Sequence, residues 1–383
     1  MPRKKSSSTR QSVPLSRILT SNPWAVLMFC AINTLFVAKY TSRFTGWWPL
    51  VAIAFFVLLL IASTFAVSIR HSFHKKKKQV YVAFAVVAVA FLALQYSINP
   101  MTVQVDRWSA IDSFLSFLLS GRYPYAAPTH LGGYGSPLPV WQILHLPFFL
   151  WGNVGLSLLV CLGLFISAIR YYWGSSKAMV CLLLMVLSPA FWFEVAVRSD
   201  LLANFLLVAA WCCWLRERKH YSKRWFAISL VTGLFLSTRL STIIPIGMVL
   251  LRPYMTLTWP KKTGSVAVAL LTAALTVLPF LLWGGSQFFS ELGPFALQTR
   301  QGHPADFAIF LPLGIWLTYQ WKSTAQMGRN IAAMLCALVI VTFAHNMLAS
   351  GNYQLFSATY DISYFCMALP FVILSLSMTE TKH

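Results

Sequence analysis

The feature that most constrains this chain is a series of apolar runs, most of them close to the length that crosses a membrane. A hydrocarbon core of about 30 Å requires roughly 20 apolar residues in a helix. Apolar residues make up 58% of the 383 residues and charged residues only 10%, too little polar surface for a soluble protein of this size. The sequence therefore predicts an integral membrane protein. The runs are 23–39, 47–69, 79–97, 137–151, 153–172, 178–193, 200–215, 225–251, 264–283, 306–320, 331–348 and 362–378.

These runs predict an all-α fold, a polytopic transmembrane bundle of about 11 to 13 helices. No linker separates them, so residues 1–383 are expected to form a single transmembrane domain. The longest interruption, residues 98–136, is expected to be an external loop. Apolar residues at helical spacing in this loop predict an amphipathic helix along the outer membrane surface. They are Ile111, Phe114, Leu115, Leu118 and Leu119.

Two runs are expected to be irregular. Residues 137–151 are short and contain three prolines, which indicates a partial or re-entrant segment and not a full span. Residues 225–251 contain Arg239 and Pro245 between two apolar halves, which indicates a helical hairpin. An Arg in lipid is costly, so Arg239 is expected at the outer end of the turn or in a water-filled cavity.

The net charge of +21 is distributed as in a membrane protein and does not indicate binding of nucleic acid. The basic residues cluster in short connectors such as "HKKKK" at 74–78 and "RERKHYSKR" at 216–224. Cytoplasmic connectors of membrane proteins are rich in Lys and Arg and also attract anionic lipids. With these connectors inside, seven of the nine acids are expected on the outer face: Asp106, Asp112, Glu194, Asp200, Glu291, Asp306 and Asp361.

The sequence gives no signal for a metal or another cofactor. The seven cysteines lie in or beside apolar runs without the spacing of a metal site, so they are expected to be packing residues. The histidines, among them His130, His303 and His345, also show no ligand spacing. A divalent cation is therefore not supported by the residues.

The order of several motifs resembles the GT-C superfamily of polytopic glycosyltransferases, which includes the protein O-mannosyltransferases and the bacterial lipid A aminoarabinose transferases. Asp106 follows an early membrane helix, a surface helix ends in "GRYPY", and "YGSPLP" leads into the next segment. "VRSDLLANF" follows farther on, and "STRLS" and "YDISYFCMALP" are also similar to family patterns. The resemblance covers about two thirds of the chain at the level of pattern.

The resemblance implies transfer of a sugar from a polyprenyl-phosphate donor to an unidentified acceptor on the outer face, in the bacterial plasma membrane because no retention signal is seen. Inverting transfer requires a carboxylate to take the proton of the acceptor hydroxyl, and Asp106 is the matching residue. Arg239, and next Arg198, would stabilise the departing lipid phosphate. Beside Asp106, Arg107 and Trp108 stand where many members carry a second acid, which argues against a metal-dependent mechanism. Further candidate substrate-binding residues are Asp112, Tyr123, Tyr125, His130, Tyr134, Asp200 and Asp361.

Simpler roles for the charged residues, and two rival functions, stay open at this point. Asp106 could simply cap the surface helix, and Asp112 could belong to the hydrated face of that helix. Arg198 could form a structural ion pair with Glu194 or Asp200. The main alternative function is a transporter or flippase, because transporters also use broken helices and an Arg within a span. A third possibility is a non-catalytic subunit that kept a GT-C-like fold.

Overall fold

The computed structural model describes residues 21–69, 77–218, 221–300, 302, 306–357 and 360–379. Within these ranges the chain is helical, and the only strand-like feature is an isolated bridge between Pro128 and Tyr134. The described part thus confirms the predicted all-α bundle. Its longest apolar helices are α2 (Pro23–Thr41), α3 (Trp48–Ser68), α4 (Lys77–Ser97), α8 (Leu156–Trp173), α14 (Trp259–Gly284) and α17 (Thr324–Ser350).

The number of helices that can cross a membrane alone is smaller than the number of apolar runs. By length and composition six described helices qualify, or seven if a bent pair counts as one span. The remaining apolar helices are shorter and pack against the long ones. They are α9 (Ser175–Val186), α10 (Pro189–Ala196), α11 (Leu201–Glu217), α12 (Tyr221–Leu236), α13 (Ile243–Met255), α16 (Phe307–Gln320) and α18 (Leu369–Met378).

The bent pair corrects the prediction of one continuous span at 178–193. The chain turns by 69° between α9 and α10. Ser188 caps α10 by accepting a hydrogen bond from the Phe191 backbone, and Pro189 has no N–H with which to continue α9. Asn33 of α2 accepts hydrogen bonds from the Ser188 hydroxyl and the Ala190 backbone, so the break is held from a neighbouring helix.

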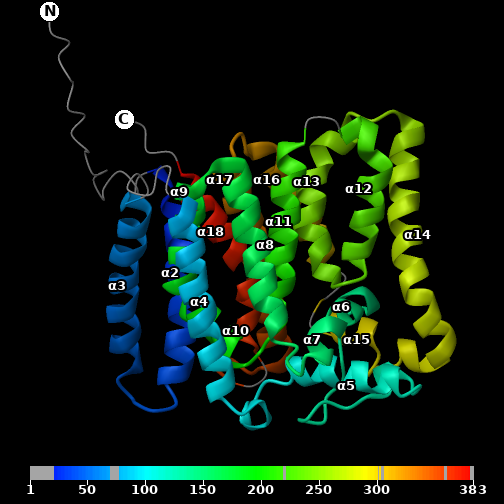
Figure 1. The fold of residues 1–383 in the computed structure, drawn as a ribbon, viewed down its shortest axis with the longest axis horizontal. Coiled ribbons are helices and arrows are strands. Elements are labelled where there is room, and N and C mark those ends of the chain that lie inside the picture. Colours follow the sequence, from blue (N-terminus) through cyan, green and yellow to red (C-terminus); the bar gives the residue numbers. More distant parts are fainter. Residues whose placement is uncertain are drawn as a thin grey trace, which may run out of the picture.

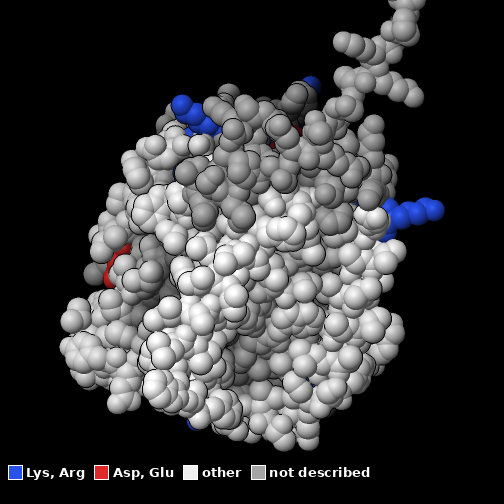
Figure 2. Space-filling model, turned by 90° about the vertical axis from the view of Figure 1, so that its left-hand side faces the viewer, with Lys and Arg blue, Asp and Glu red and all other residues white. Residues whose placement is uncertain are grey.

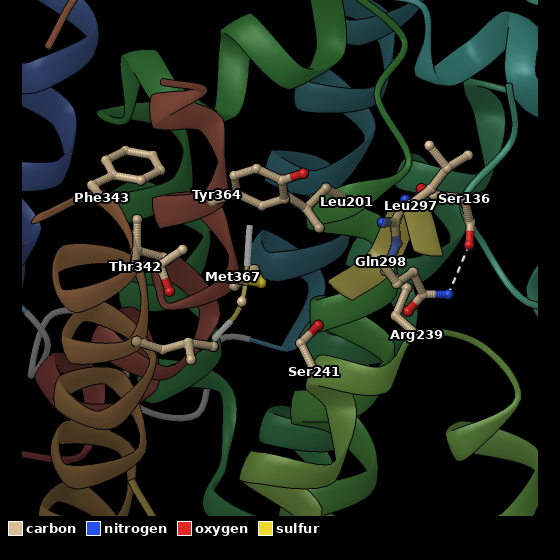
Figure 3. A pocket seen from close by; sticks show the side chains of 13 residues that line it. Ser136, Leu201, Arg239, Ser241, Leu297, Gln298, Thr342, Phe343, Tyr364 and Met367 are labelled. Atoms are coloured by element: carbon tan, nitrogen blue, oxygen red, sulfur yellow. Dashed lines mark hydrogen bonds between the residues drawn. The ribbon is translucent and has the colours of Figure 1, made fainter. Parts of the chain in front are cut away.

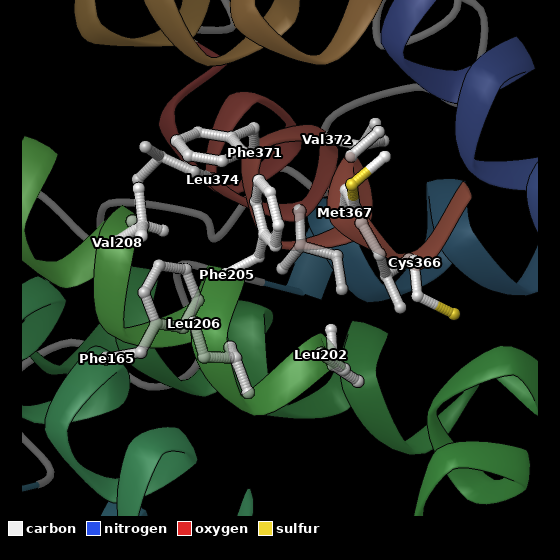
Figure 4. Packing of buried hydrophobic residues seen from close by; sticks show 14 of the residues in the cluster. Phe165, Leu202, Phe205, Leu206, Val208, Cys366, Met367, Phe371, Val372 and Leu374 are labelled. Atoms are coloured by element: carbon white, nitrogen blue, oxygen red, sulfur yellow. The ribbon is translucent and has the colours of Figure 1, made fainter. Parts of the chain in front are cut away.

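The centre of the bundle is α18, whose ten residues are all buried. Figure 4 shows Phe371, Val372 and Leu374 of this helix beside side chains of α11. Phe205 and Leu206 of α11 are fully buried in the same apolar cluster. Burying a side chain of this size contributes about 2 kcal/mol. The last predicted run, 362–378, is therefore an internal helix preceded by a 3-10 segment, η7 (Ile362–Met367).

The flank of the bundle carries apolar side chains outward, as expected for contact with lipid. Leu50, Ile53, Leu58 and Phe65 of α3 are all more than half exposed. Figure 2 shows this side of the molecule, and its broad middle carries almost no charged side chain. The exposed apolar face and the long apolar helices together identify an integral membrane protein.

One end of the bundle is closed by short helices, at the bottom of Figure 1. They are α5 (Arg107–Leu119), α6 (Pro139–Leu144), α7 (Leu146–Leu150) and α15 (Pro294–Thr299). Helix α5 confirms the predicted helix in this loop, and its residues Ile111, Phe114 and Leu115 are buried. The pair α6 and α7 confirms that 137–151 does not cross the bundle as one helix. Acids predicted to share a face lie in or beside segments at this end, among them α5 and the starts of α11 and α15, opposite the start of α2 and the end of α18.

The predicted hairpin at 225–251 is also present. Helices α12 and α13 are joined by a turn that contains Arg239 and a short 3-10 segment, η4 (Leu240–Thr242). The backbone N–H groups of Leu138 and Val140, at the start of α6, donate to the carbonyls of Thr238 and Ser237. The unpaired donors at the beginning of α6 thus meet the unpaired acceptors at the end of α12. This exchange fixes the re-entrant segment on the hairpin turn.

Candidate functional site

The candidate site begins with a buried ion pair beneath the closed end. Arg239 Nη2 donates to Asp200 Oδ2 at 2.6 Å, and the side chains are only 9% and 2% exposed. The indole N–H of Trp141, on α6, donates to the same carboxylate oxygen at 2.6 Å. Asp200 precedes α11, so three segments far apart in sequence meet at one carboxylate. Two of the predicted substrate-binding residues, Arg239 and Asp200, are therefore in contact, and Arg239 lies at the hairpin turn as expected.

A second set of charges lies next to the first and centres on Arg107. Arg107 donates to Asp361 Oδ2 at 2.6 Å and to the Ser199 hydroxyl at 3.2 Å. Its guanidinium is also 3.8 Å from Glu194 Oε1. The positive charge of Arg107 acts on Asp200 as well, so the two sets form one network. We call Arg107, Glu194, Asp200, Arg239 and Asp361 the charged network.

The two acids that contact Arg107 differ in their access to solvent. The Asp361 side chain is 44% exposed, whereas that of Glu194 is fully buried. Burial opposes ionisation of Asp361, but Arg107 and hydrogen bonding by Ser363 outweigh it, so the pKa of Asp361 lies below its ordinary value. Glu194 Oε2 accepts a hydrogen bond from the Leu202 backbone and so caps the start of α11. Glu194 is thus a structural acid, and Asp361 is the one that meets solvent.

A pocket of about 160 Å³ adjoins the charged network. Arg239 forms part of one wall together with Ser136, Ser241 and Gln298, and Figure 3 shows Thr342 and Phe343 of α17 across from them. Since a water molecule occupies about 30 Å³ of liquid, the pocket has room for roughly five waters or for a phosphate group. Its other lining residues are largely apolar: Leu201, Leu297, Gly302, Leu338, Val339, Tyr364 and Met367.

Gln298 and Tyr364 link the pocket to the surrounding segments. Gln298, on α15, donates to the Ser136 carbonyl at 2.7 Å and accepts from the Leu240 backbone at 2.7 Å. Gln298 therefore connects Ser136, in the loop before α6, to Leu240, in the turn between α12 and α13. The Arg107 guanidinium lies 5.3 Å from the centre of the Tyr364 ring, so a pocket wall also carries the cation of the charged network.

Asp106, the predicted base, lies directly before α5. It stands at the N-cap position, yet its side chain makes no capping hydrogen bond, so capping is not its role. Asp106 Oδ2 instead accepts from the Thr129 hydroxyl at 2.9 Å. Gly133 passes so close to this carboxylate that a Cβ there would lie 2.7 Å from Oδ2. No contact within the described chain joins Asp106 to Arg239; the next residue, Arg107, provides the connection to the charged network.

Arg198 does not take the place predicted for it. It donates to the Gln95 carbonyl at 2.8 Å and holds a left-handed backbone with φ of 52°. Glu194 pairs with Arg107, and Asp200 pairs with Arg239. The structural ion pair considered for Arg198 is therefore wrong. Arg198 connects the segment before α11 to Gln95 of α4, and it does not line the pocket.

The aromatic candidates of the outer loop are held mainly by packing. Tyr125 is buried, its hydroxyl donates to the Pro137 carbonyl, and its ring packs on Phe114. Tyr123 packs on Trp283 and lies against Gly284. The remaining candidates, Asp112, His130 and Tyr134, are half-buried. Burial raises the pKa of Asp112. The two ring nitrogens of His130 form hydrogen bonds with the Ser109 hydroxyl and the Val103 carbonyl.

Arg107, Trp141 and Gln298 are functional candidates that the sequence does not single out. Only Arg107 carries a usable signal, because a cation at the first position of a helix is unfavourable beside the positive end of the helix dipole and implies an acidic partner. Trp141 and Gln298 reach residues far away in sequence, which no local pattern can reveal.

The donor set does not suit a divalent cation. Within the described ranges, no group of three or more His, Cys, Asp or Glu side chains could hold a metal ion. Asp200 and Asp361 each have a carboxylate oxygen occupied by an arginine at 2.6 Å.

Comparison with protein-family models, with curated proteins and with solved structures gives no match for this chain.

Proposed function

We propose that this chain is a membrane glycosyltransferase that moves a sugar from a polyprenyl-phosphate carrier to an acceptor at the outer face of the bacterial plasma membrane. The observation that carries the proposal is the position of Arg239. Its guanidinium lines a pocket whose other walls are partly polar and partly apolar, inside a bundle whose buried core is largely apolar. A lipid that carries a phosphate combines the two properties that such a pocket accommodates.

Arg239 suits a phosphate leaving group for electrostatic reasons. A guanidinium presents several N–H donors in a fork that matches phosphate oxygens. Negative charge grows on the lipid phosphate as the glycosidic bond breaks, so a fixed cation stabilises the transition state more than the ground state. Asp200, itself bound by the Trp141 indole, holds Arg239 through Nη2, and Arg239 Nε is buried without a partner among the described residues.

The proton of the acceptor hydroxyl would pass to Asp106. This carboxylate accepts a single side-chain hydrogen bond, from Thr129, whereas Asp200 and Asp361 are each bound by an arginine. Among the described residues Asp106 has no ion pair with an arginine or lysine, so of the three carboxylates it is the one left available to an acceptor hydroxyl. In this scheme the acceptor oxygen attacks the anomeric carbon, the bond to the phosphate oxygen breaks, and the proton goes to Asp106.

Binding of lipid phosphate tests the role of Arg239. Purified protein in detergent is titrated with a polyprenyl monophosphate and with the neutral polyprenol of the same chain length, and bound lipid is counted by native mass spectrometry. The unmodified chain should prefer the phosphate, and Arg239→Ala should reduce that preference at least tenfold, a loss of about 1.4 kcal/mol.

Two further variants make this test decisive. Arg122 is exposed at the same end and lies over Phe117, away from the pocket, so Arg122→Ala should leave the preference unchanged. Arg239→Leu combined with Asp200→Leu removes both buried charges, a change that buried pairs often tolerate, and should also lose the preference. An unchanged preference in either folded Arg239 variant would refute the assignment.

A further inference from the structure

A second cavity lies at the opposite end of the bundle from the charged network, and the proposed function does not use it. It has a volume of about 460 Å³ and is lined at the ends of α8, α9, α11, α17 and α18. Three cationic side chains line it: Lys177 in the first turn of α9, Arg216 in the last turn of α11, and Arg329 in α17. No Asp or Glu of the described chain lines this cavity. We call it the basic cavity.

Within the described ranges, neither arginine of the basic cavity forms an ion pair with a carboxylate. Among the described residues, Arg216 donates only to the Lys322 carbonyl, at 3.4 Å, and Arg329 only to the Asn330 side chain, at 3.2 Å. Both contacts leave most N–H groups of each guanidinium available, since each carries five. The start of α17, a helix of 27 residues, also lines the cavity and adds the positive end of its dipole. The cavity is therefore suited to an anion.

A buried amide gives independent information about the ligand. Asn22, 4% exposed, lines the cavity and donates through Nδ2 to the hydroxyls of Ser375 and Thr379. Both hydroxyls donate their own proton to backbone carbonyls, those of Ala325 and Ser375, so they can only accept from Asn22. This fixes the orientation of the amide. Asn22 Oδ1 is then buried without a hydrogen-bond partner in the part of the chain that the structure describes.

A buried acceptor without a partner is unfavourable, so a ligand that supplies a donor would relieve this cost. We infer that the basic cavity binds a phosphate ester that carries a hydroxyl group, with the phosphate on Arg216, Arg329 and Lys177 and the hydroxyl donating to Asn22 Oδ1. Trp173 also lines the cavity, and Trp is enriched where helices leave the membrane. A phosphoglycerol lipid headgroup and a soluble glycerol phosphate share this chemistry.

The test measures binding of both forms to the full chain. Purified protein in detergent is titrated with sn-glycerol 3-phosphate and, separately, with phosphatidylglycerol, with diacylglycerol as the uncharged control. The combined variant Arg216→Gln, Arg329→Gln should weaken binding at least tenfold. Lys223→Gln combined with Arg224→Gln removes the same charge from exposed residues outside the cavity and should change binding less than twofold.

The outcomes separate the two sources of ligand. Saturable binding of phosphatidylglycerol alone identifies a lipid headgroup site, and binding of glycerol phosphate identifies a site for a soluble ester; each must be lost in the Arg216 and Arg329 variant. Asn22→Ala should weaken glycerol-phosphate binding more than binding of methyl phosphate, which lacks the hydroxyl. Failure of both ligands to bind, or equal losses in the two double variants, would overturn the inference.

Discussion

At the scale of single residues, the surroundings of each acid decide what it can do. Asp200 is buried and held by two donors, Asp361 is partly exposed beside Arg107, and Asp106 stands apart with one hydrogen bond from Thr129. The sequence marks all three as scarce acids of the outer face but cannot rank them. Their ranking depends on contacts with Arg239 and Arg107, which lie 39 and 254 residues away from their partners.

The two ion pairs should contribute very differently to stability. Asp200→Ala leaves Arg239 charged and buried without its partner, and such a loss destabilises a protein by about 3 to 5 kcal/mol. Asp361→Ala removes a pair whose acid is 44% exposed, together with the hydrogen bond to the Ser363 backbone, which should destabilise by about 2 kcal/mol or less. Thermal unfolding in detergent should therefore show the larger decrease in Tm for Asp200→Ala. Equal decreases in Tm for the two variants would contradict the difference in burial between Asp200 and Asp361.

At the scale of helices, the sequence predicts where apolar segments lie better than it predicts how they are connected. The runs at 23–39, 47–69 and 153–172 correspond to α2, α3 and α8 with small changes at their ends. Proline and polar residues correctly mark the re-entrant segment and the hairpin. The sequence does not predict the break between α9 and α10, because its stabilisation comes from Asn33 on another helix.

The contact between α12 and α14 depends on a glycine. A Cβ at Gly233 would clash with the Ala269 carbonyl oxygen, so the two helices approach closely only because this side chain is absent. Gly233→Ala should push the helices apart and lower the Tm measured in detergent by several degrees. Gly247→Ala, on α13, has nothing within 4 Å of the added Cβ and should leave the Tm unchanged or raise it slightly. A smaller effect at Gly233 than at Gly247 would contradict this packing.

At the scale of the whole molecule, charge and hydrophobicity divide the bundle into three zones. The charged network and most of the described acids lie at one end, the apolar flank lies between, and the basic cavity lies at the end where α2 starts and α18 ends. The sequence predicts the apolar middle and the grouping of the acids from composition and connector charge. It does not predict the two cavities, because each is lined by residues from helices that meet only in the folded bundle.

The central claim is transfer of a sugar from a lipid phosphate, with Asp106 as the base. Every such transfer releases a polyprenyl phosphate, whatever the sugar and acceptor are, so this product can be measured without knowing either. Membrane vesicles that contain native acceptors are supplied with polyprenyl-phosphate-linked sugars, and free polyprenyl phosphate is quantified by mass spectrometry. Glu291→Gln, which changes an exposed acid outside the candidate site residues, serves as the control.

The account predicts that the unmodified chain and Glu291→Gln release polyprenyl phosphate, whereas Asp106→Asn, inserted in the membrane to the same amount, releases at least a hundredfold less, within the usual contribution of a general base. Release by Asp106→Asn at the rate of the unmodified chain would contradict the account.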